Sequence, residues 1–286
     1  MTAYYSKAFS QSFSNFSMKQ TKFLSPFCSI SVMRVTVCEL PDSLVDETWE
    51  NLVRHVRKEQ SELVVLPEMP ACPWFASMSR FDERVWQEAL QAHDALMTRL
   101  DELTPATVIS TRPVQDGAYR LNQAFFWNEG YCAIRTKYYL PDEEGFYEAS
   151  WFHRGEKDFT VFRTRGIAIG VLICSELMFN EWARLYGKQG AHIIAVPRAT
   201  ERKTLDRWLV ALRMAAIVSG AFVLSSNRVG KSGDAGGVEF GGCGWIISPE
   251  GDVLASTSRS KPFITMDIDL NEAVCAKRTY PRYIPE

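Results

Sequence analysis

The sequence predicts an α/β fold in which two mixed β-sheets pack together and helices cover them on the outside. Short β-branched runs alternate with longer stretches whose apolar residues recur at helical spacing. Several short runs are almost continuously apolar, which is typical of strands that are covered on both faces. Other neighbouring runs are separated by a turn only, and such hairpins make the sheets mixed.

The expected elements follow from these patterns in chain order. In the first helical stretch, 46–60, the apolar residues Trp49, Leu52 and Val56 share one face. Further helices are expected at 82–103, 175–190 and 204–220, and a glycine closes each of the last two, as is common at helix ends. The runs expected to form strands are 33–40, 61–68, 106–112, 121–128, 131–140, 165–174, 191–197, 221–230, 242–257 (two strands and a turn) and 262–270.

Residues 1–32 differ in composition from the rest of the chain. They are rich in Ser and Phe and contain no Asp, Glu or Arg. A targeting leader has such a composition in part, but Met33 stands directly before the first expected strand. We therefore expect a flexible N-terminal extension at 1–32, with translation starting at Met33, and one domain at 33–286.

The bulk composition excludes several classes of function. With 32 basic and 34 acidic residues, the net charge of -2 gives no electrostatic case for binding nucleic acid or an anionic membrane. No apolar stretch reaches the 18 residues of a membrane span. The seven cysteines are scattered and odd in number, which favours reduced thiols and a cytoplasmic protein. None of the four histidines is clustered with cysteine, so we expect no metal and no cofactor.

Three side chains of reactive types follow expected strands. Glu68 comes after the run "LVVLP", Lys137 comes after "YCAIRT", and Cys174 ends the apolar strand at 165–174. Ligands of α/β proteins bind at the carboxyl ends of strands. A thiol at the start of a helix is stabilised as a thiolate by the helix dipole, and a buried carboxylate is a candidate base. Taken singly, each has a structural alternative: an inert buried cysteine, a loop glutamate, an exposed lysine.

Together these segments resemble the nitrilase superfamily of carbon–nitrogen hydrolases. The motifs are "ELVVLPE", "RTKYYLPDEEGFYE" and "GVLICSELMFNEWARLYGKQGAHIIAVP", and Glu68, Lys137 and Cys174 fall on the family's Glu, Lys and Cys positions. The resemblance extends over about residues 34–270. It implies a four-layer αββα sandwich of two mixed sheets with outer helices, a carbon–nitrogen hydrolase domain at 33–286, and a homodimer or higher homo-oligomer.

The resemblance also implies roles for individual residues. Glu68 would be the base, Cys174 the nucleophile, and Lys137 together with the backbone N–H of Ser175 would bind the oxyanion. A second glutamate supports such sites. Glu148 matches its position in "P-D-x-x-G-x-x-E" and is preferred to Glu144, with the role of holding Lys137 and orienting the substrate.

Three further residues have open roles. Glu144 and Arg198 are candidate substrate-binding residues, but Glu144 can equally belong to a solvated loop, and Arg198 can equally pair structurally. Arg198 departs from the small or polar residue expected beside the pocket. Glu176 lies in the first turn of the expected helix, where an acid is favoured by the dipole, so a structural role is preferred.

The resemblance implies cysteine-dependent hydrolysis of a small amide or N-carbamoyl compound through a thioester. Nitrile hydrolysis is an alternative, although Ser175 stands where a nitrilase would have Trp. A non-catalytic scaffold that kept the fold is another alternative. A thiol sensor would need a resolving cysteine for Cys174, and Cys132 and Cys243 are the nearest in sequence.

Overall fold

The computed structural model describes residues 32–232 and 237–285. The extension expected at 1–32 therefore lies outside the described residues, except for Val32, which begins the first strand. In the described part of the chain, no helix has the length and the apolar character that a membrane span requires.

Thirteen strands form one mixed sheet in the described residues. Their order is β5-β4-β3-β2-β1-β9-β8-β7-β6, with β10 and β11 beside β9, β12 beside β11, and β13 beside β1. The bounds are β1 Val32–Pro41, β2 Leu63–Val65, β3 Thr107–Asp116, β4 Tyr119–Trp127, β5 Tyr131–Thr136, β6 Phe162–Thr164, β7 Ile167–Val171, β8 Ile193–Pro197, β9 Phe222–Lys231, β10 Glu239–Gly241, β11 Trp245–Ile247, β12 Val253–Ser256 and β13 Phe263–Asp269.

Strand β1 joins the two halves of this sheet. Its residues 35–37 pair with β2, and its residues 39–41 pair in parallel with β9. The hydrogen-bonded ladder is therefore continuous, and the expected division into two separate sheets is not confirmed. The sequence shows which runs are strands, but the strand that each one pairs with is decided by packing between distant segments.

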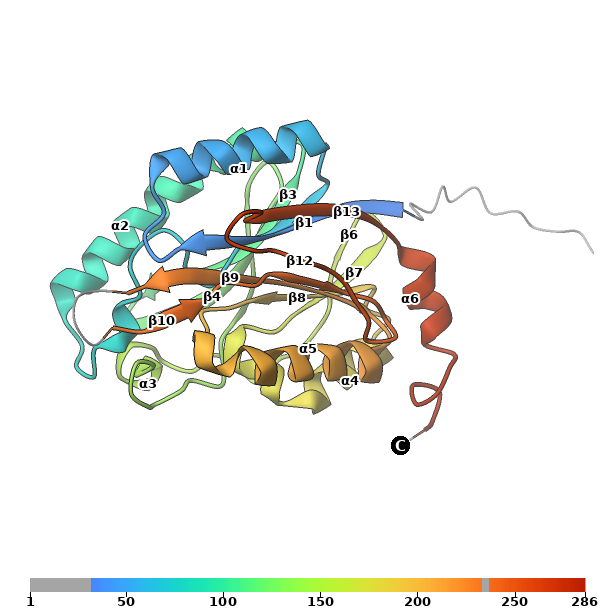
Figure 1. The fold of residues 1–286 in the computed structure, drawn as a ribbon. Coiled ribbons are helices and arrows are strands. Elements are labelled where there is room, and N and C mark those ends of the chain that lie inside the picture. The colour runs from blue at the N-terminus through green and yellow to red at the C-terminus, as the bar shows by residue number, and fades with distance from the viewer. Residues whose placement is uncertain (1–31, 233–236, 286) are drawn as a thin grey trace, which may run out of the picture.

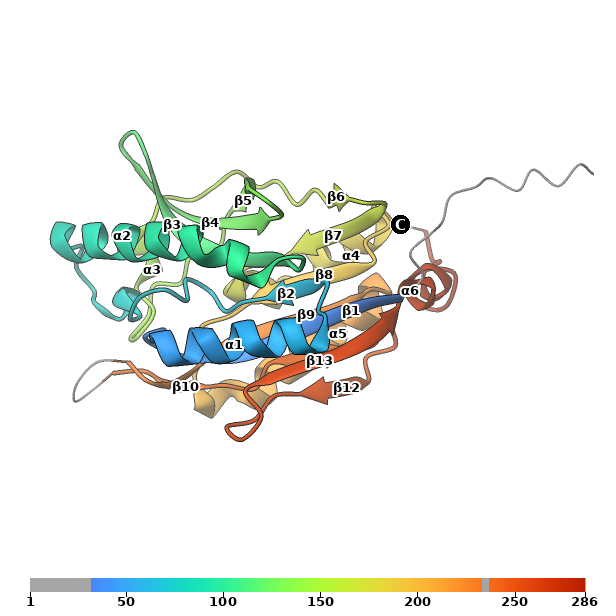
Figure 2. The same ribbon diagram turned by 90° about the horizontal axis from the view of Figure 1, so that it is seen from above.

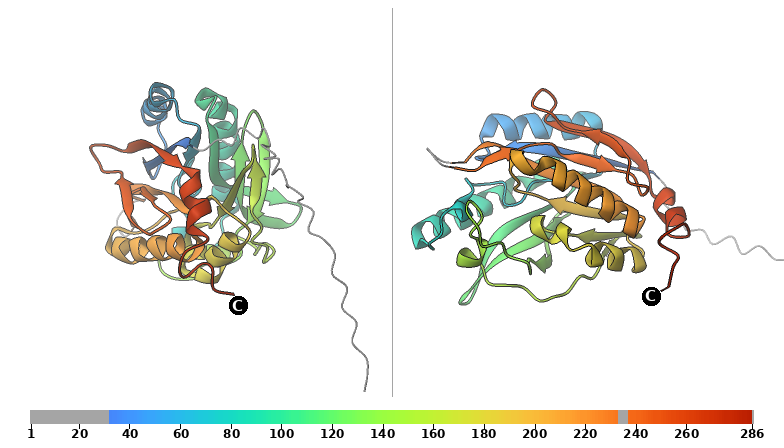
Figure 3. Two further views of the ribbon diagram at one scale, coloured as in Figure 1. Left: turned by 90° about the vertical axis from the view of Figure 1, so that its right-hand side faces the viewer. Right: turned by 60° about the horizontal axis from the view of Figure 1, so that its bottom comes forward.

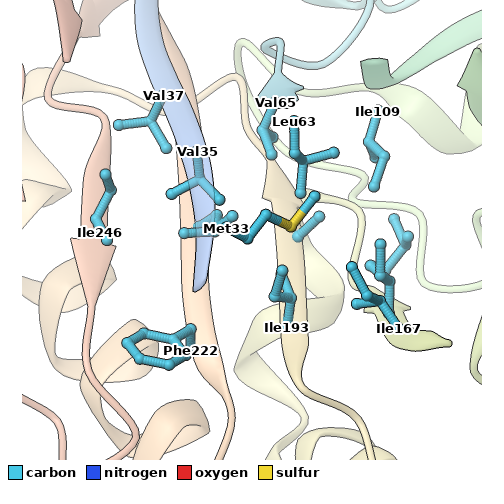
Figure 4. Close-up of a cluster of buried hydrophobic side chains, with 14 of the residues drawn as sticks. Met33, Val35, Val37, Leu63, Val65, Ile109, Ile167, Ile193, Phe222 and Ile246 are labelled. Atoms are coloured by element: carbon cyan, nitrogen blue, oxygen red, sulfur yellow. The ribbon is translucent and has the colours of Figure 1, made fainter. Parts of the chain in front are cut away.

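The sheet curls until it is nearly barrel-shaped. The ring of Phe126 on β4 lies 4.7 Å from that of Phe162 on β6, although the two strands are near opposite ends of the strand order. The inner faces of both halves share one apolar core. Figure 4 shows side chains from both halves in it, among them Val35, Ile193 and Phe222.

Helices cover the outer faces of the sheet. The bounds are α1 Asp46–Glu59, α2 Glu83–Arg99, α3 Glu148–Trp151, α4 Asn180–Lys188, α5 Leu205–Ser219 and α6 Leu270–Ala276. Figures 1 and 2 show α1 and α2 over one half, and α4 and α5 over the other. The end-on view in Figure 3 shows the strands enclosed between these helices. The apolar stripe of α1 explains its position, because Trp49, Leu52 and Val56 are all buried against the sheet.

Most expected elements are present, with one correction that matters for function. The helix expected at 175–190 is instead a 3-10 turn, η3 Cys174–Met178, followed by α4. The structure also has elements that the sequence patterns did not predict: α3, α6, β6 and β10. They are short, and for short segments tertiary contacts outweigh local propensity.

The central strands place their carboxyl ends at one edge. Strands β3, β2, β1, β9, β8 and β7 are mutually parallel. Strand β5 has the direction of β3, because β4 lies antiparallel between them. The residues that follow β2, β5, β7 and β8 are therefore brought to the same edge.

Candidate active site

Cys174 lies in a sharp turn after β7. Its backbone has a φ of 47°, a left-handed conformation that is uncommon for a residue with a side chain. The Glu176 carboxylate supports this turn by accepting a hydrogen bond of 2.9 Å from the N–H of Ile173. The Cys174 thiol is buried and lies 3.8 Å from the backbone O of Ala199. The turn therefore aims the sulfur away from the strand that precedes it, towards the loop after β8.

Glu68 follows β2 and is fully buried. Arg228, which is also buried, fixes the backbone there by donating to the carbonyl O of Glu68 (3.1 Å) and to that of Met69. Asn122 Nδ2 donates to Glu68 Oε1 over 2.8 Å. The other oxygen, Oε2, has no hydrogen-bond partner among the described residues. Since a buried carboxylate oxygen is costly to leave unpaired, Oε2 is the Glu68 oxygen that can still accept a hydrogen bond.

Lys137 lies at the end of β5, and its ammonium group is buried between two carboxylates. Its Nζ is 2.9 Å from Glu68 Oε1 and 2.7 and 2.8 Å from the two oxygens of Glu148. Glu148 begins the short helix α3, so the loop after β5 folds back on the lysine that starts it. The structure thus brings Glu68, Lys137 and Glu148 into direct contact.

The charges in this group shift one another's pKa values. Burial alone would lower the pKa of Lys137, but the Glu148 and Glu68 carboxylates outweigh burial and raise it. Burial raises the pKa of Glu148 to about 7, because the nearby Glu68 charge adds to burial while Lys137 opposes both. At neutral pH the lysine is therefore a fixed cation, and Glu148 is poised between its two forms.

The Cys174 thiol is neutral at rest, contrary to the thiolate that the sequence suggested. Burial and then the Glu68 charge raise its pKa well above that of a free thiol, and Lys137 offsets this only in part. The dipole of a full α-helix, which was expected at this position, is not present, since a 3-10 turn begins at Cys174. A neutral thiol is a poor nucleophile, so Cys174 could attack a carbonyl carbon only after a base had taken its proton.

Glu176 has a structural role, as expected, but it acts through an ion pair and hydrogen bonds and not through a helix dipole. It forms a buried ion pair with Arg135, and its Oε1 accepts the N–H of Tyr138 over 2.8 Å. It therefore ties the turn that carries Cys174 to the strand end that carries Lys137.

A cavity of about 250 Å³ opens beside Cys174. Ser175 lines it, and its hydroxyl is bound to the carbonyl O of Tyr139 over 2.7 Å. Glu144 is exposed and does not line the cavity, whereas its neighbour Glu143 does. The lining residues are Pro141, Glu143, Phe146, Glu148, Cys174, Ser175, Met178, Ala199, Thr200, Glu201, Thr204, Arg207 and Trp208.

Arg198 does not line this cavity either. Its guanidinium is fully buried and binds the hydroxyls of Ser225 (2.6 Å) and Thr200 (2.7 Å) and the carbonyl O of Cys243 (2.6 Å). These acceptors are protein groups, so of the two roles left open for Arg198 the contacts favour the structural one.

No sequence pattern pointed to Asn122, Glu143 or Glu201. Asn122 is fully buried in β4, but Arg120 and Gln123 of the same strand are polar too, so no pattern in the sequence sets Asn122 apart. The two glutamates are loop residues without a pattern. Within residues 32–232 and 237–285, no group of three or more His, Cys, Asp or Glu side chains is placed to hold a metal ion.

The sequence matches the Carbon-nitrogen hydrolase family over residues 44–278. The chain belongs to the carbon-nitrogen hydrolase family. It is similar to an N-carbamoylputrescine amidase of Arabidopsis thaliana, with 26% identity over 78% of this chain and 80% of that protein. It is also similar to a nitrilase of Pyrococcus abyssi, with 27% identity over 77% of this chain and 82% of that one.

The fold is shared with a carbon-nitrogen hydrolase from Helicobacter pylori G27, whose crystal structure matches with a TM-score of 0.79. That match has 21% identity and covers 88% of this chain and 94% of the other. As a member of the carbon-nitrogen hydrolase family with amidase relatives, the protein is a hydrolase of carbon–nitrogen bonds other than peptide bonds.

Proposed function

We propose that the protein hydrolyses the carbon–nitrogen bond of a small amide or N-carbamoyl compound, with Cys174 as nucleophile and a thioester as intermediate. The observation that carries the proposal is the Lys137 ammonium, buried between Glu68 and Glu148 at the strand edge where Cys174 meets the cavity. Base, cation and thiol are the groups that acyl transfer to sulfur requires.

The first half of the reaction transfers the acyl group to sulfur. Glu68 Oε2 accepts the thiol proton, and the sulfur attacks the substrate carbonyl carbon. The Lys137 ammonium and the backbone N–H of Ser175 stabilise the oxyanion. Protonated Glu68 then gives its proton to the leaving nitrogen, the carbon–nitrogen bond breaks, and ammonia or an amine departs.

The second half frees the enzyme. Glu68 takes a proton from water, the hydroxide attacks the thioester carbon, and the carbon–sulfur bond breaks. The sulfur leaves as a thiol with the proton that Glu68 held. Glu148 keeps Lys137 in place throughout, because both its oxygens accept from Nζ. All groups needed for these steps belong to the protein.

The substrate class rests on three supports. The relative from Arabidopsis thaliana is named for an N-carbamoyl compound. A cavity of about 250 Å³ suits a small molecule. Ser175, in place of a Trp after the nucleophile, favours an amide over a nitrile.

The proposal is tested by measuring ammonia release from a panel of simple amides, N-carbamoyl amines and nitriles. We expect release from members of the first two groups, and loss of at least about 10⁴-fold in Cys174→Ala. The intact mass of the enzyme trapped with substrate should rise by that of the acyl group. Cys132→Ala, which removes an exposed thiol, is the matched control and should keep full activity.

Three results would contradict the proposal. Activity that survives Cys174→Ala would exclude that nucleophile. Ammonia from nitriles alone would favour nitrile hydrolysis, and ammonia from none of the compounds would favour a binding protein that retains the fold.

We also propose that copies of the chain associate into a homodimer or a larger homo-oligomer, as the resemblance to the superfamily implies. Helix α5 exposes apolar side chains, with Val210 67% and Met214 41% exposed. Exposed apolar residues gathered on one helix are a common mark of an interface.

A further inference from the structure

Asn122 is a buried residue of the site to which the proposed reaction gives no part. It lies on β4, and its side chain contacts Glu68, with Nδ2 donating to Glu68 Oε1 over 2.8 Å. The other amide atom, Oδ1, is buried and has no hydrogen-bond partner in the described residues. A buried polar atom without a partner is destabilising, so stability alone does not explain an asparagine at this position.

The contacts of Asn122 link the proposed base to the lysine beside it. The backbone O of Asn122 accepts the N–H of Lys137 over 2.8 Å, which holds the end of β5. Its side chain reaches Glu68, which follows β2. Strand β3 lies between β2 and β4, so the contact between Asn122 and Glu68 comes from the side-chain hydrogen bond and not from strand pairing. One residue therefore contacts both the base and the cation.

The chemistry of the two groups fixes which way round the Asn122 amide lies. An ionised carboxylate only accepts hydrogen bonds, and in an amide only the nitrogen donates. The reversed amide would place Oδ1 against Glu68 Oε1, which are two acceptors, at a fully buried position. Contact with Glu68 therefore requires Nδ2 on this side, and Oδ1 is left unpaired as a result.

The same hydrogen bond makes the two oxygens of Glu68 unequal. Oε1 accepts from Lys137 Nζ over 2.9 Å and from Asn122 Nδ2 over 2.8 Å, whereas Oε2 accepts from no described residue. A proton can bind Oε2 without displacing a donor, but at Oε1 it would compete with two. Because Asn122 is neutral, it adds a donor without adding positive charge. A second cation would hold the carboxylate ionised and weaken it as a base.

We propose that Asn122 is a positioning residue of this hydrolase: by holding Glu68 Oε1, its amide leaves Oε2 as the oxygen that takes the proton of Cys174. In that step the S–H bond breaks, its electron pair stays on sulfur, and the O–H bond to Oε2 forms. Asn122 itself neither gains nor loses a proton. The inference rests on the proposed function, in which Glu68 is the base. The unpaired Oδ1 is the loss of stability that this arrangement entails.

The test measures the titration of Glu68 without any substrate. Protein labelled with ¹³C at the glutamate carboxyl carbon is titrated by NMR, and the Glu68 signal is assigned by its loss in Glu68→Gln. Asn122→Leu removes the donor and keeps the branching and the number of heavy atoms. Asn227→Leu is the matched control, because Asn227 is equally buried but pairs both amide atoms with the backbone of Thr200 and Gly242.

The charged and titratable groups that face Glu68 are not changed by either substitution. They are Lys137, Glu148, Cys174 and Arg228, of which the last binds the backbone O of Glu68. Both titrations are repeated in Glu148→Gln protein, which removes the carboxyl whose pKa burial raises to about 7. A change that persists there belongs to Asn122.

We expect the midpoint of the Glu68 titration to lie about one pH unit higher in Asn122→Leu than in wild type, because the ionised carboxyl has lost a donor. The midpoint in Asn227→Leu should match that of wild type. Where an amide is hydrolysed, the acid limb of the kcat/KM profile should move by the same amount, with a loss of about tenfold below the midpoint. KM should change little, because Asn122 does not line the cavity.

Two outcomes would overturn the inference. One is an unchanged midpoint in Asn122→Leu, and the other is an equal rise in Asn227→Leu, which would mean that any loosening of the interior has this effect. If Asn122→Leu does not fold, as judged by circular dichroism and melting, Asn122→Ala replaces it with the same expectation. The titration needs no substrate, so its result stands even if no amide is hydrolysed, and the ammonia assay reports the failure of the proposed function separately.

Discussion

Burial raises the pKa of the Cys174 thiol, so the reactivity that we propose for it depends on neighbouring groups. Two neighbouring groups can offset the low reactivity of a neutral thiol. Lys137 is fixed as a cation by two carboxylates, and Glu68 keeps one oxygen unpaired. A protonated thiol reacts slowly with oxidants, because the thiolate is the reactive form.

A substitution of Glu68 tests its proposed role as the base separately from the role of Cys174. We expect Glu68→Gln to lower kcat by about 10²- to 10⁴-fold, because the amide cannot accept the thiol proton. Glutamine keeps the contact with Lys137, so the melting temperature should change little. Glu62→Gln, which changes an exposed glutamate just before β2, is the control. Full activity in Glu68→Gln would assign the base to another residue.

The raised pKa of Glu148 predicts a pH dependence of stability. Its folded value of about 7 exceeds the value of 4.5 of a free carboxyl, so the fold favours the protonated form. This contribution is present below pH 4.5 and is lost as the pH rises through 7. Relative to Glu148→Gln, the free energy of unfolding of the wild type should fall by about 3 kcal/mol over that range.

Urea unfolding of both proteins at several pH values between 4 and 8 measures this difference. If the free energy of unfolding of the wild type minus that of Glu148→Gln is the same at every pH, the pKa of Glu148 is not shifted by folding. If this difference rises with pH, Lys137 holds Glu148 ionised throughout the range.

At the scale of elements, the turn after β7 depends on the ion pair of Glu176 with Arg135. Both side chains are buried, and Glu176 also binds the N–H groups of Ile173 and Tyr138. A residue of this turn, Cys174, has a left-handed backbone. The carboxylate therefore compensates for a conformation that the chain would not adopt by itself.

Truncating this carboxylate should destabilise the protein. We expect Glu176→Ala to lower the free energy of unfolding by about 3–5 kcal/mol, because Arg135 is left buried without a counter-ion. Glu239→Gln breaks an exposed ion pair with Arg202 and should change it by less than about 1 kcal/mol. Thermal melting measures both changes, and an equal small effect of the two would show that Glu176 does not brace the turn.

At the scale of the whole molecule, the continuous sheet has one consequence for the site. Because β1 pairs with both β2 and β9, the strand end that carries Glu68 and the strand ends that carry Cys174 and Arg198 belong to one hydrogen-bonded framework. The site is built on rigid elements, and the loop that carries Glu148 is tied to them by its contact with Lys137.

The proposed association of copies is also a property of the whole molecule. We expect light scattering of the wild type to give twice the mass of one chain or more. Val210→Asp should lower it, because a charge would then be buried in the interface. Val253→Asp changes an exposed valine on β12 and serves as the control. A monomeric wild type would contradict the proposal.

The sequence by itself determined the elements and the candidate residues, because these depend on local patterns. Period and composition predicted α1, α5 and the buried strands, and the carboxyl-end rule selected Glu68, Lys137 and Cys174. The motif around "P-D-x-x-G-x-x-E" selected Glu148, and the structure places it against Lys137.

Strand pairing and the electrostatics of the site were decided by tertiary structure alone, since both depend on which distant segments meet. Strand partners, and with them the single curled sheet, follow from packing across the whole chain. The neutral state of Cys174, the shifted pKa of Glu148 and the unpaired oxygen of Asn122 arise from burial among residues far apart in sequence. Solvation and Coulomb energy vary with three-dimensional surroundings, and a linear pattern does not contain these surroundings.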